Sequence, residues 1–448
     1  MMTTIAIKST TNIRHIIWQT VTALFRIGDR HLRPVASNYS PKITNTKPHG
    51  ARELPTPSLK QKWLTNSIFA CFLLGTCIIG SQHPWYSWDI LGYIGSALSL
   101  EGHDTQTVHD LTYSYARQYI APKDYAALTD VSVPYLHDMA TNAEHFQEQL
   151  PFYKVKPLYI GAIYLLYKAG INPVHGSILI SCFASVFCGI LVLKWLTQYF
   201  DIVRSVAWSI LLLLTAGILE FAAITVPDIL SSFAILLSFY CIVTEKRAAL
   251  IIMILFFAML IRIDNIILLL AYLIYCIIFG RSHIPGKTVL GAGVLAIAIL
   301  LVVLTYTGYY GWQVLFYHTF IGPLLQPAHF TGKLTLGKYL SAFTYGLRLK
   351  PPCNMSLFFI FLGMVGASTL SRTYLRSNRL FHAICIAGLV AIIHFIIFPE
   401  SAPRFFFAYY LLTGIFFLER VTTMQRSLAA HSAQQQAHKL KTPIFALN

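Results

Sequence analysis

Ten apolar runs limit what this 448-residue chain can fold into more than any other feature of its sequence. Each run is close to the roughly 20 residues that an α-helix needs to cross the hydrocarbon core of a bilayer. Hydrophobic residues make up 56% of the chain and charged residues 12%, where soluble proteins have about 25% charged residues. The sequence therefore predicts an all-α polytopic membrane protein with about ten transmembrane helices. The predicted crossings are residues 64–81, 175–193, 205–223, 228–244, 247–262, 265–280, 287–306, 355–371, 380–398 and 404–420.

An eleventh apolar run, residues 157–170, is short for a crossing and contains Lys168. Its path decides which side of the membrane every later loop faces. If the run lies on the outer surface, the inner segments hold 23 of the 34 Lys and Arg residues and 5 of the 18 acidic residues. Because Lys and Arg accumulate on the cytoplasmic side of membrane proteins, we expect a surface-lying run and both termini inside.

This orientation divides the chain into three parts. They are a basic cytoplasmic tail over residues 1–62, expected to be mostly disordered, a transmembrane domain over 63–421, and a cytoplasmic C-terminal tail over 422–448. Two large outer segments are expected within the domain, over 81–173 and 309–354, and the first is expected to contain surface-lying helices. The net charge of +16 is then a topology signal, so membrane lipids are expected partners and nucleic acid is not.

Metal-binding patterns are weak in this sequence. The eight cysteines form no CxxC pair and no disulfide framework. Three His-Asp dipeptides begin at His103, His109 and His137 in the first outer segment. Imidazoles and carboxylates can bind zinc, but these spacings match no compact ligand pattern, and no metal site is predicted from them.

Asp89 follows the first predicted crossing, in the sequence Trp88-Asp89-Ile90, ahead of an apolar-rich stretch that would keep it near the membrane surface. A carboxylate at this place can accept a proton from a hydroxyl nucleophile or bind a divalent cation through oxygen. The structural alternative is that Asp89 complements the dipole of the helix that it begins.

Lys154 and Lys156 close the first outer segment, just before the surface-lying run. If this stretch is locally strand-like, side chains two residues apart face the same way. The two cations then suit either a phosphate group or anionic lipid headgroups.

Four more ionisable residues lie at the outer ends of predicted crossings, where charges are costly and functional roles are the default expectation. Asp228 follows Pro227, and a helix N-cap is its structural alternative. Arg262 and Asp264 share a tight turn, where they can form a structural ion pair or contact a substrate. Arg404 begins an apolar helix, where a cation opposes the helix dipole. A bound phosphate would account for it, since the planar guanidinium fork suits phosphate.

These elements, taken in order, resemble the GT-C superfamily of integral-membrane glycosyltransferases. That superfamily includes protein O-mannosyltransferases and the enzymes that modify lipid A with aminoarabinose. The resemblance rests on Trp88-Asp89, Lys156-Pro157-Leu158-Tyr159, Pro227-Asp228-Ile229-Leu230, Arg262-Ile263-Asp264-Asn265 and the Pro-rich stretch from Pro399 to Phe405.

The resemblance implies transfer of a hexose or pentose from a polyprenyl-phosphate donor to a hydroxyl of a glycolipid, polysaccharide or protein. The reaction would occur on the outer face of a bacterial inner (plasma) membrane. Asp89 would be the general base, and Arg404, helped by Lys154 and Lys156, would bind the phosphate. The resemblance further implies that the donor site is shaped by Arg262 and Asp264 and that the sugar or acceptor is oriented by Asp228.

Two rival functions use the same sequence differently. A non-catalytic transporter of lipid-linked saccharides should place charges at mid-membrane on broken helices and often has internal repeats. Here the charges collect at outer helix ends and no repeat is visible, which favours chemistry at the outer face. A polymerase of lipid-linked saccharides from another class is the second rival.

Overall fold

The computed structural model describes residues 58–279, 285–348, 378–400 and 402–441. Several predictions lie outside these residues. They are the crossing at 355–371, nearly all of the N-terminal tail, the end of the second outer segment and the last residues of the C-terminal tail.

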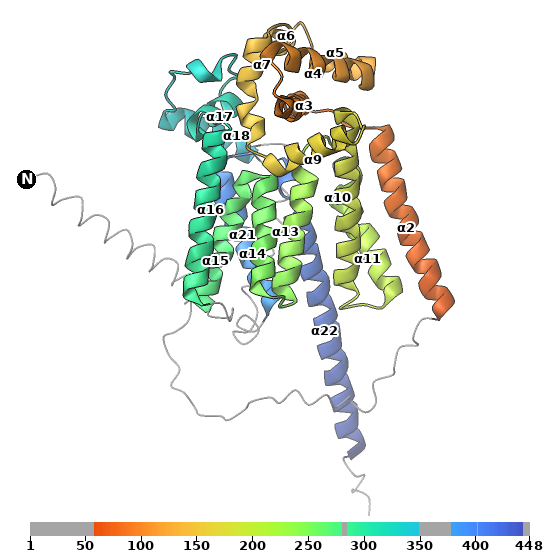
Figure 1. The fold of residues 1–448 in the computed structure, drawn as a ribbon. Helices are drawn as coiled ribbons and strands as arrows, with labels where there is room; N and C mark the ends of the chain where they lie inside the picture. The colour runs from red at the N-terminus through yellow and green to blue at the C-terminus, as the bar shows by residue number, and fades with distance from the viewer. Residues whose placement is uncertain (1–57, 280–284, 349–377, 401, 442–448) are drawn as a thin grey trace, which may run out of the picture. The chain divides into compact units, whose positions relative to one another are not determined.

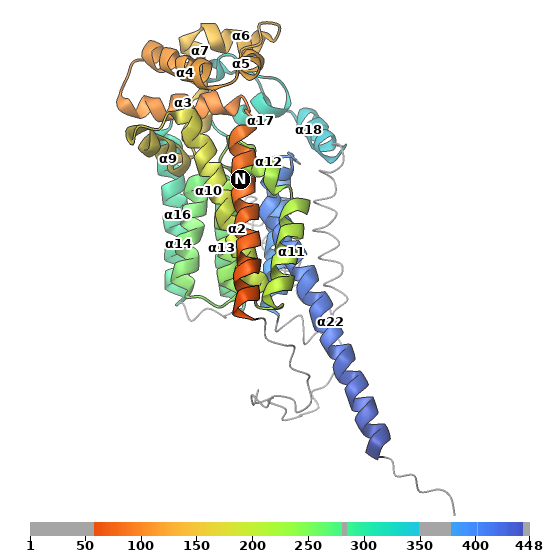
Figure 2. The same cartoon turned by 90° about the vertical axis from the view of Figure 1, so that its right-hand side faces the viewer.

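The described residues are helical and contain no strand, which confirms the predicted all-α class for this part of the chain. Four helices are long and apolar enough to cross a membrane: α2 (Leu59–Gln82), α10 (Pro173–Leu196), α16 (Gly286–Tyr306) and α21 (Arg379–Ile397). Shorter apolar helices lie beside them (Figures 1 and 2). They are α11 (Ile202–Thr215), α13 (Asp228–Val243), α14 (Ala248–Ile261) and α15 (Ile266–Phe279), the last preceded by the 3-10 turn η2 (Ile263–Asn265).

Side-chain caps explain where several apolar helices begin. The polar residue before the helix accepts a hydrogen bond from a backbone N–H group of the first turn, which would otherwise lack a partner. The capping residues are Ser58 before α2, Asn172 before α10, Asp201 before α11 and Asn378 before α21.

The predicted crossing at 205–223 is two helices rather than one. α11 ends at Thr215, Gly217 adopts a left-handed conformation with φ of +88°, and α12 (Ile218–Ala223) follows. Glycine tolerates this conformation because it has no Cβ atom. The last predicted crossing also differs, since the chain forms the 3-10 turn η4 (Pro403–Phe405) before α22 (Phe407–Lys441), which continues well beyond residue 420.

A layer of short helices from the first outer segment lies across one end of the apolar helices (Figures 1 and 2). It contains α3 (Asp89–Leu98), η1 (Ser99–Glu101), α4 (Thr105–Tyr119), α5 (Pro122–Leu128), α6 (Pro134–Thr141), α7 (Ala143–Gln149), α8 (Pro151–Lys154) and α9 (Pro157–Lys168). The layer has its own core, in which Ile90 and Ile94 of α3 pack with Phe146 of α7.

The stretch from Leu150 to Lys156 is not strand-like, so the condition under which Lys154 and Lys156 face the same way is not met. Pro151 begins α8 and Pro157 begins α9, each at the first helical turn, where the missing proline N–H costs nothing. With 12 residues, α9 is about 18 Å long, too short to cross a hydrocarbon core of about 30 Å.

The second outer segment contains α17 (Trp312–Phe320), η3 (Pro327–His329) and α18 (Leu336–Arg348). It is joined to the first outer segment by polar contacts. The amide of Gln149 donates to the carbonyls of Leu324 and Leu325 at 3.0 and 3.1 Å, and the backbone N–H of Ala328 donates to Glu148 at 3.1 Å. The two outer segments therefore form one cover over this end of the apolar helices.

Candidate functional site

Local contacts bring the start of α3 beside the start of α13. The backbone N–H of Trp85 donates to the carbonyl of Ala223 at 2.9 Å, and Trp85 also forms an isolated bridge with Ile224. The hydroxyl of Ser181, on α10, donates to the carbonyl of Ile224 at 2.6 Å. The loops that precede these two helices are therefore fixed to each other and to α10.

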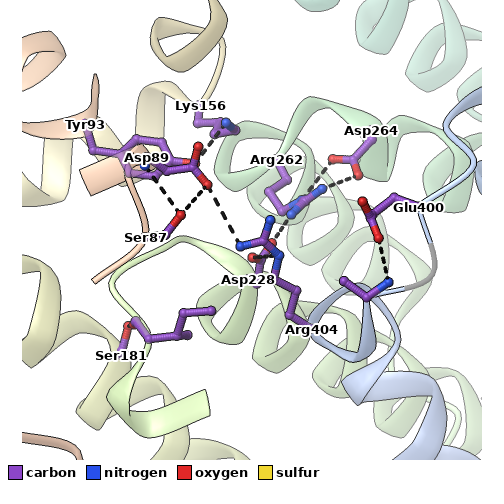
Figure 3. A network of polar contacts seen from close by, with 12 residues as sticks. Ser87, Asp89, Tyr93, Lys156, Ser181, Asp228, Arg262, Asp264, Glu400 and Arg404 are labelled. Atoms are coloured by element: carbon purple, nitrogen blue, oxygen red, sulfur yellow. Dashed lines mark hydrogen bonds and ion pairs between the residues drawn. The ribbon is translucent and has the colours of Figure 1, made fainter. Parts of the chain in front are cut away.

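Asp89 is the first residue of α3, where its charge also complements the helix dipole. Its carboxylate accepts hydrogen bonds from the hydroxyl of Ser87 at 3.1 Å and from the phenol of Tyr153 at 3.2 Å. Oδ2 of Asp89 lies 3.9 Å from Nη1 of Arg404, so the carboxylate faces the guanidinium across the site (Figure 3).

Arg262 lies between two carboxylates. Its Nε and Nη2 donate to Asp264 at 3.1 and 2.8 Å, and its Nη1 contacts Asp228. The side chain of Asp228 is only 3% exposed. Asp228 is the first residue of α13 and makes no capping hydrogen bond, so the N-cap alternative for it was wrong. The expected Arg262–Asp264 pair is present, and it includes Asp228 as a third member.

Arg404 lies in η4 and approaches the carboxylates of Asp89 and Asp228 without forming a hydrogen bond to them. Its Nε is 3.6 Å from Oδ2 of Asp228, and this buried N–H has no hydrogen-bond acceptor among the described residues. The guanidinium carbons of Arg404 and Arg262 lie 5.1 and 4.6 Å from the ring centre of Phe405. Arg262 thus donates a hydrogen bond from each of its three nitrogens, whereas Nε of Arg404 keeps a donor available.

Lys156 sits among aromatic rings next to Asp89. Its ammonium donates to the hydroxyl of Tyr93 at 2.9 Å and lies 4.8 and 5.3 Å from the ring centres of Tyr93 and Tyr153. Burial lowers the pKa of Lys156 to about 8, although the nearby Asp89 favours the charged form. Burial also raises the pKa of Tyr93 well above its usual range, so Tyr93 stays a neutral hydroxyl.

Lys154 does not join this group. It ends α8, and among the residues that the structure describes no hydrogen bond or ion pair links it to the cluster. Burial alone lowers its pKa. Lys154 and Lys156 therefore differ in surroundings, because the chain turns from α8 into α9 between them.

The His-Asp dipeptides do not gather into a ligand set. His109 accompanies Asp110 at 3.4 Å, while His145 pairs with Asp138 at 2.6 Å. Within the described ranges, no group of three or more His, Cys, Asp or Glu side chains is arranged to hold a metal ion.

The sequence did not lead us to predict His394, Tyr93 or Tyr153 as residues of the site. Nε2 of His394, on α21, lies 3.0 Å from Oδ2 of Asp264, and its side chain is 15% exposed. The sequence contained a signal for it, since an ionisable residue inside the apolar run 380–398 is a functional candidate by default. No comparable signal marks Tyr93 or Tyr153, whose partners are distant in sequence.

A small cavity of about 20 Å³ lies within the cluster, lined by Asp228, Arg262, His394, Arg404 and Phe405 among others. A cavity of that size holds one water molecule and is too small for a sugar. The carboxylates of the cluster number three (Asp89, Asp228 and Asp264), and so do its lysine and arginine cations (Lys156, Arg262 and Arg404). The site is thus narrow and formally charge-balanced.

The polar cluster unites six of the seven residues that the sequence singled out, leaving only Lys154 apart. Comparisons of the chain with protein-family models, with curated proteins and with solved structures found no match.

Proposed function

We propose that this protein is a glycosyltransferase of the GT-C type. It would transfer a hexose or pentose from a polyprenyl-phosphate donor to a hydroxyl of a glycolipid, polysaccharide or protein acceptor. One observation carries the proposal. Asp89 and Arg404 are distant in sequence, yet Oδ2 of Asp89 and Nη1 of Arg404 lie 3.9 Å apart beneath the outer segments. A carboxylate beside an arginine with a free donor supplies both groups that such a transfer needs.

The proposal includes a location. About ten helices would cross the inner (plasma) membrane of a bacterium, with both termini in the cytoplasm and the cluster on the outer face. The support is the excess of Lys and Arg in the predicted inner segments, together with four described helices able to cross a membrane.

In the proposed reaction, Asp89 removes the proton from the acceptor hydroxyl. The acceptor oxygen then forms a bond to the anomeric carbon while the bond from that carbon to the phosphate oxygen breaks. The electron pair leaves with the polyprenyl phosphate, and the configuration at the anomeric carbon inverts. The charge that grows on the phosphate is stabilised by Arg404 and Lys156, which act best where water is excluded.

The positions of the other charged residues suggest different roles for them. Arg262, already paired with Asp228 and Asp264, holds these two carboxylates in place beside the donor site. Asp228 also lies 3.6 Å from Nε of Arg404, which orients that guanidinium toward Asp89. Since the cavity is too small for a sugar, binding of a donor there requires the residues that line it to move apart.

The test is transfer of a radiolabelled sugar from a polyprenyl-phosphate donor by membranes that contain the full chain. Comparison of glycolipids and glycoproteins from cells with and without the protein identifies the sugar and acceptor first. Asp89→Asn should abolish transfer while expression and membrane insertion stay normal. Arg404→Ala should reduce it about 100-fold. The matched controls, Asp124→Asn in α5 and Arg204→Ala in α11, change exposed charges away from the cluster and should retain activity.

The same experiment separates the enzyme from a transporter. A transporter of lipid-linked saccharides would move labelled lipid across the membrane without forming a new glycosidic bond. Membranes with the unmodified chain and membranes with Asp89→Asn would then transfer the same amount of labelled sugar. Full transfer activity in Asp89→Asn would remove Asp89 from the mechanism.

A further inference from the structure

An apolar groove runs between α14 and α16, away from the polar cluster. It has a volume of about 550 Å³ and is lined by six residues of α14, from Ala249 to Leu260, and four of α16, from Thr288 to Leu295. That volume is in the range of small-molecule binding sites. α15 packs against both helices and keeps them apart, which leaves the groove open along their outer faces.

Three cations lie at the end of this groove. Lys246 and Arg247 directly precede α14, and Lys287 is the second residue of α16, next to the lining residue Thr288. All three side chains are exposed. No ion pair engages any of them in the described parts of the chain, and the neighbouring carboxylate of Glu245 pairs with Arg379 instead.

The helix ends add to this positive potential. Neither α14 nor α16 has a side-chain cap or an acidic residue in its first turn. The N-terminus of a helix carries a partial positive charge, so cations there are unfavourable and an anion is favourable. The cytoplasmic preference for Lys and Arg explains why cations occur at this end, but it does not explain why they stand at the mouth of an apolar groove.

We infer that this groove is a binding site for an anionic glycerophospholipid of the bilayer. The headgroup phosphate would be held by Lys246, Arg247 and Lys287 at the ends of the two helices. An acyl chain would lie along the groove, where Met253 and Phe257 expose apolar surface. The inference rests on the membrane location of the chain and is independent of the proposed sugar transfer.

Two variants test the headgroup and the groove separately. In Lys246→Gln/Arg247→Gln/Lys287→Gln the cations are lost and the groove remains. In Gly291→Leu the cations remain and the groove is filled, since a Cβ atom at Gly291 meets nothing within 4 Å and the larger side chain does not clash. The matched controls are Lys60→Gln/Lys62→Gln, in the first turn of α2, and Gly75→Leu, where a Cβ atom also meets nothing within 4 Å. Figure 1 shows that α2 and α14 begin at the same end of the apolar helices.

The measurement is native mass spectrometry of the full chain in detergent, titrated with phosphatidylglycerol or with phosphatidylcholine of the same acyl chains. The unmodified chain should prefer phosphatidylglycerol about 100-fold, because each cation near an anionic headgroup contributes about a five-fold factor. The triple variant should lose this preference, Gly291→Leu should lose retention of both lipids, and the controls should behave like the unmodified chain. Equal retention of the two lipids by the unmodified chain would overturn the inference, as would undiminished phosphatidylglycerol binding by the triple variant.

Discussion

Tyr153 donates a hydrogen bond of 3.2 Å to the carboxylate of Asp89 from a ring that packs against α3. The proposed general base is therefore oriented by a residue on α8, and burial keeps the pKa of Tyr153 well above its usual range, so that the phenol stays a donor. Substitutions at residues around Asp89 can therefore change the orientation of its carboxylate without removing it.

Tyr153→Phe keeps the ring and removes the hydroxyl. We expect kcat to fall about 10- to 100-fold, because Asp89 loses one of the two hydrogen bonds that fix its orientation, while KM for the donor stays unchanged. Steady-state kinetics with varied donor checks this split. A rise in donor KM at constant kcat would assign Tyr153 to donor binding instead.

Gly92→Ala should disturb the same contact from the other side. A Cβ atom at Gly92 would lie 2.4 Å from ring carbons of Tyr153, so the ring must move. We expect the free energy of unfolding to fall by about 1–3 kcal/mol, as in other overpacked cores, and transfer to fall with it. Thermal unfolding in detergent measures the change. Gly161→Ala is the control, since a Cβ atom there meets nothing within 4 Å, and equal effects at the two glycines would refute the packing argument.

Arg262→Ala should destabilise the fold more than any loss of an exposed arginine. It leaves the carboxylate of Asp228, which is 3% exposed, without its closest cation. Breaking a buried pair in this way costs about 3–5 kcal/mol. The double variant Arg262→Gln/Asp228→Asn removes both charges and should recover most of that stability. Thermal unfolding of the single and the double variant measures the difference. If the single and double variants unfold alike, the two charges are not coupled.

Donor binding should weaken as the pH rises through about 8. Lys156 has a pKa of about 8 because of its burial, so it is a cation below that pH and neutral above it. A neutral Lys156 cannot attract phosphate, and we expect donor KM to increase about 10-fold between pH 7 and pH 9. Lys156→Arg keeps its charge throughout this range and should flatten the profile. An unchanged pH dependence in Lys156→Arg would assign the titration to another group.

The sequence predicted most members of the polar cluster because charges at the ends of apolar runs are costly wherever they occur. That physical argument applies to Asp89, Asp228, Arg262, Asp264 and Arg404 one at a time, and a shared membrane face then places them at one end of the helices. It does not specify partners, so the pairing of Arg262 with Asp228 and the unpaired Nε of Arg404 became visible only in the structure.

The failures have local causes. The stretch around Lys154 and Lys156 is not strand-like, because proline is favoured in the first helical turn and here Pro151 and Pro157 both begin helices. Gly217 interrupts a run that hydropathy alone treats as continuous, because averaging over a window hides a single left-handed residue. Tyr93 could not be predicted because its role depends on contacts between helices that are far apart along the chain, whereas His394 carries a signal of its own, as an ionisable residue inside an apolar run.

The link between Trp85 and residues 223–224 restricts how the site can open. This link joins the chain just before α3 to the chain just before α13. Asp89 and Asp228, the first residues of these helices, are therefore held in a fixed relation on one side of the site. The opposite side carries Arg404, which reaches them only through separations of 3.6 and 3.9 Å. No hydrogen bond joins Arg404 to either carboxylate among the described residues, so a phosphate that binds this guanidinium would compete with two ion pairs and no hydrogen bond.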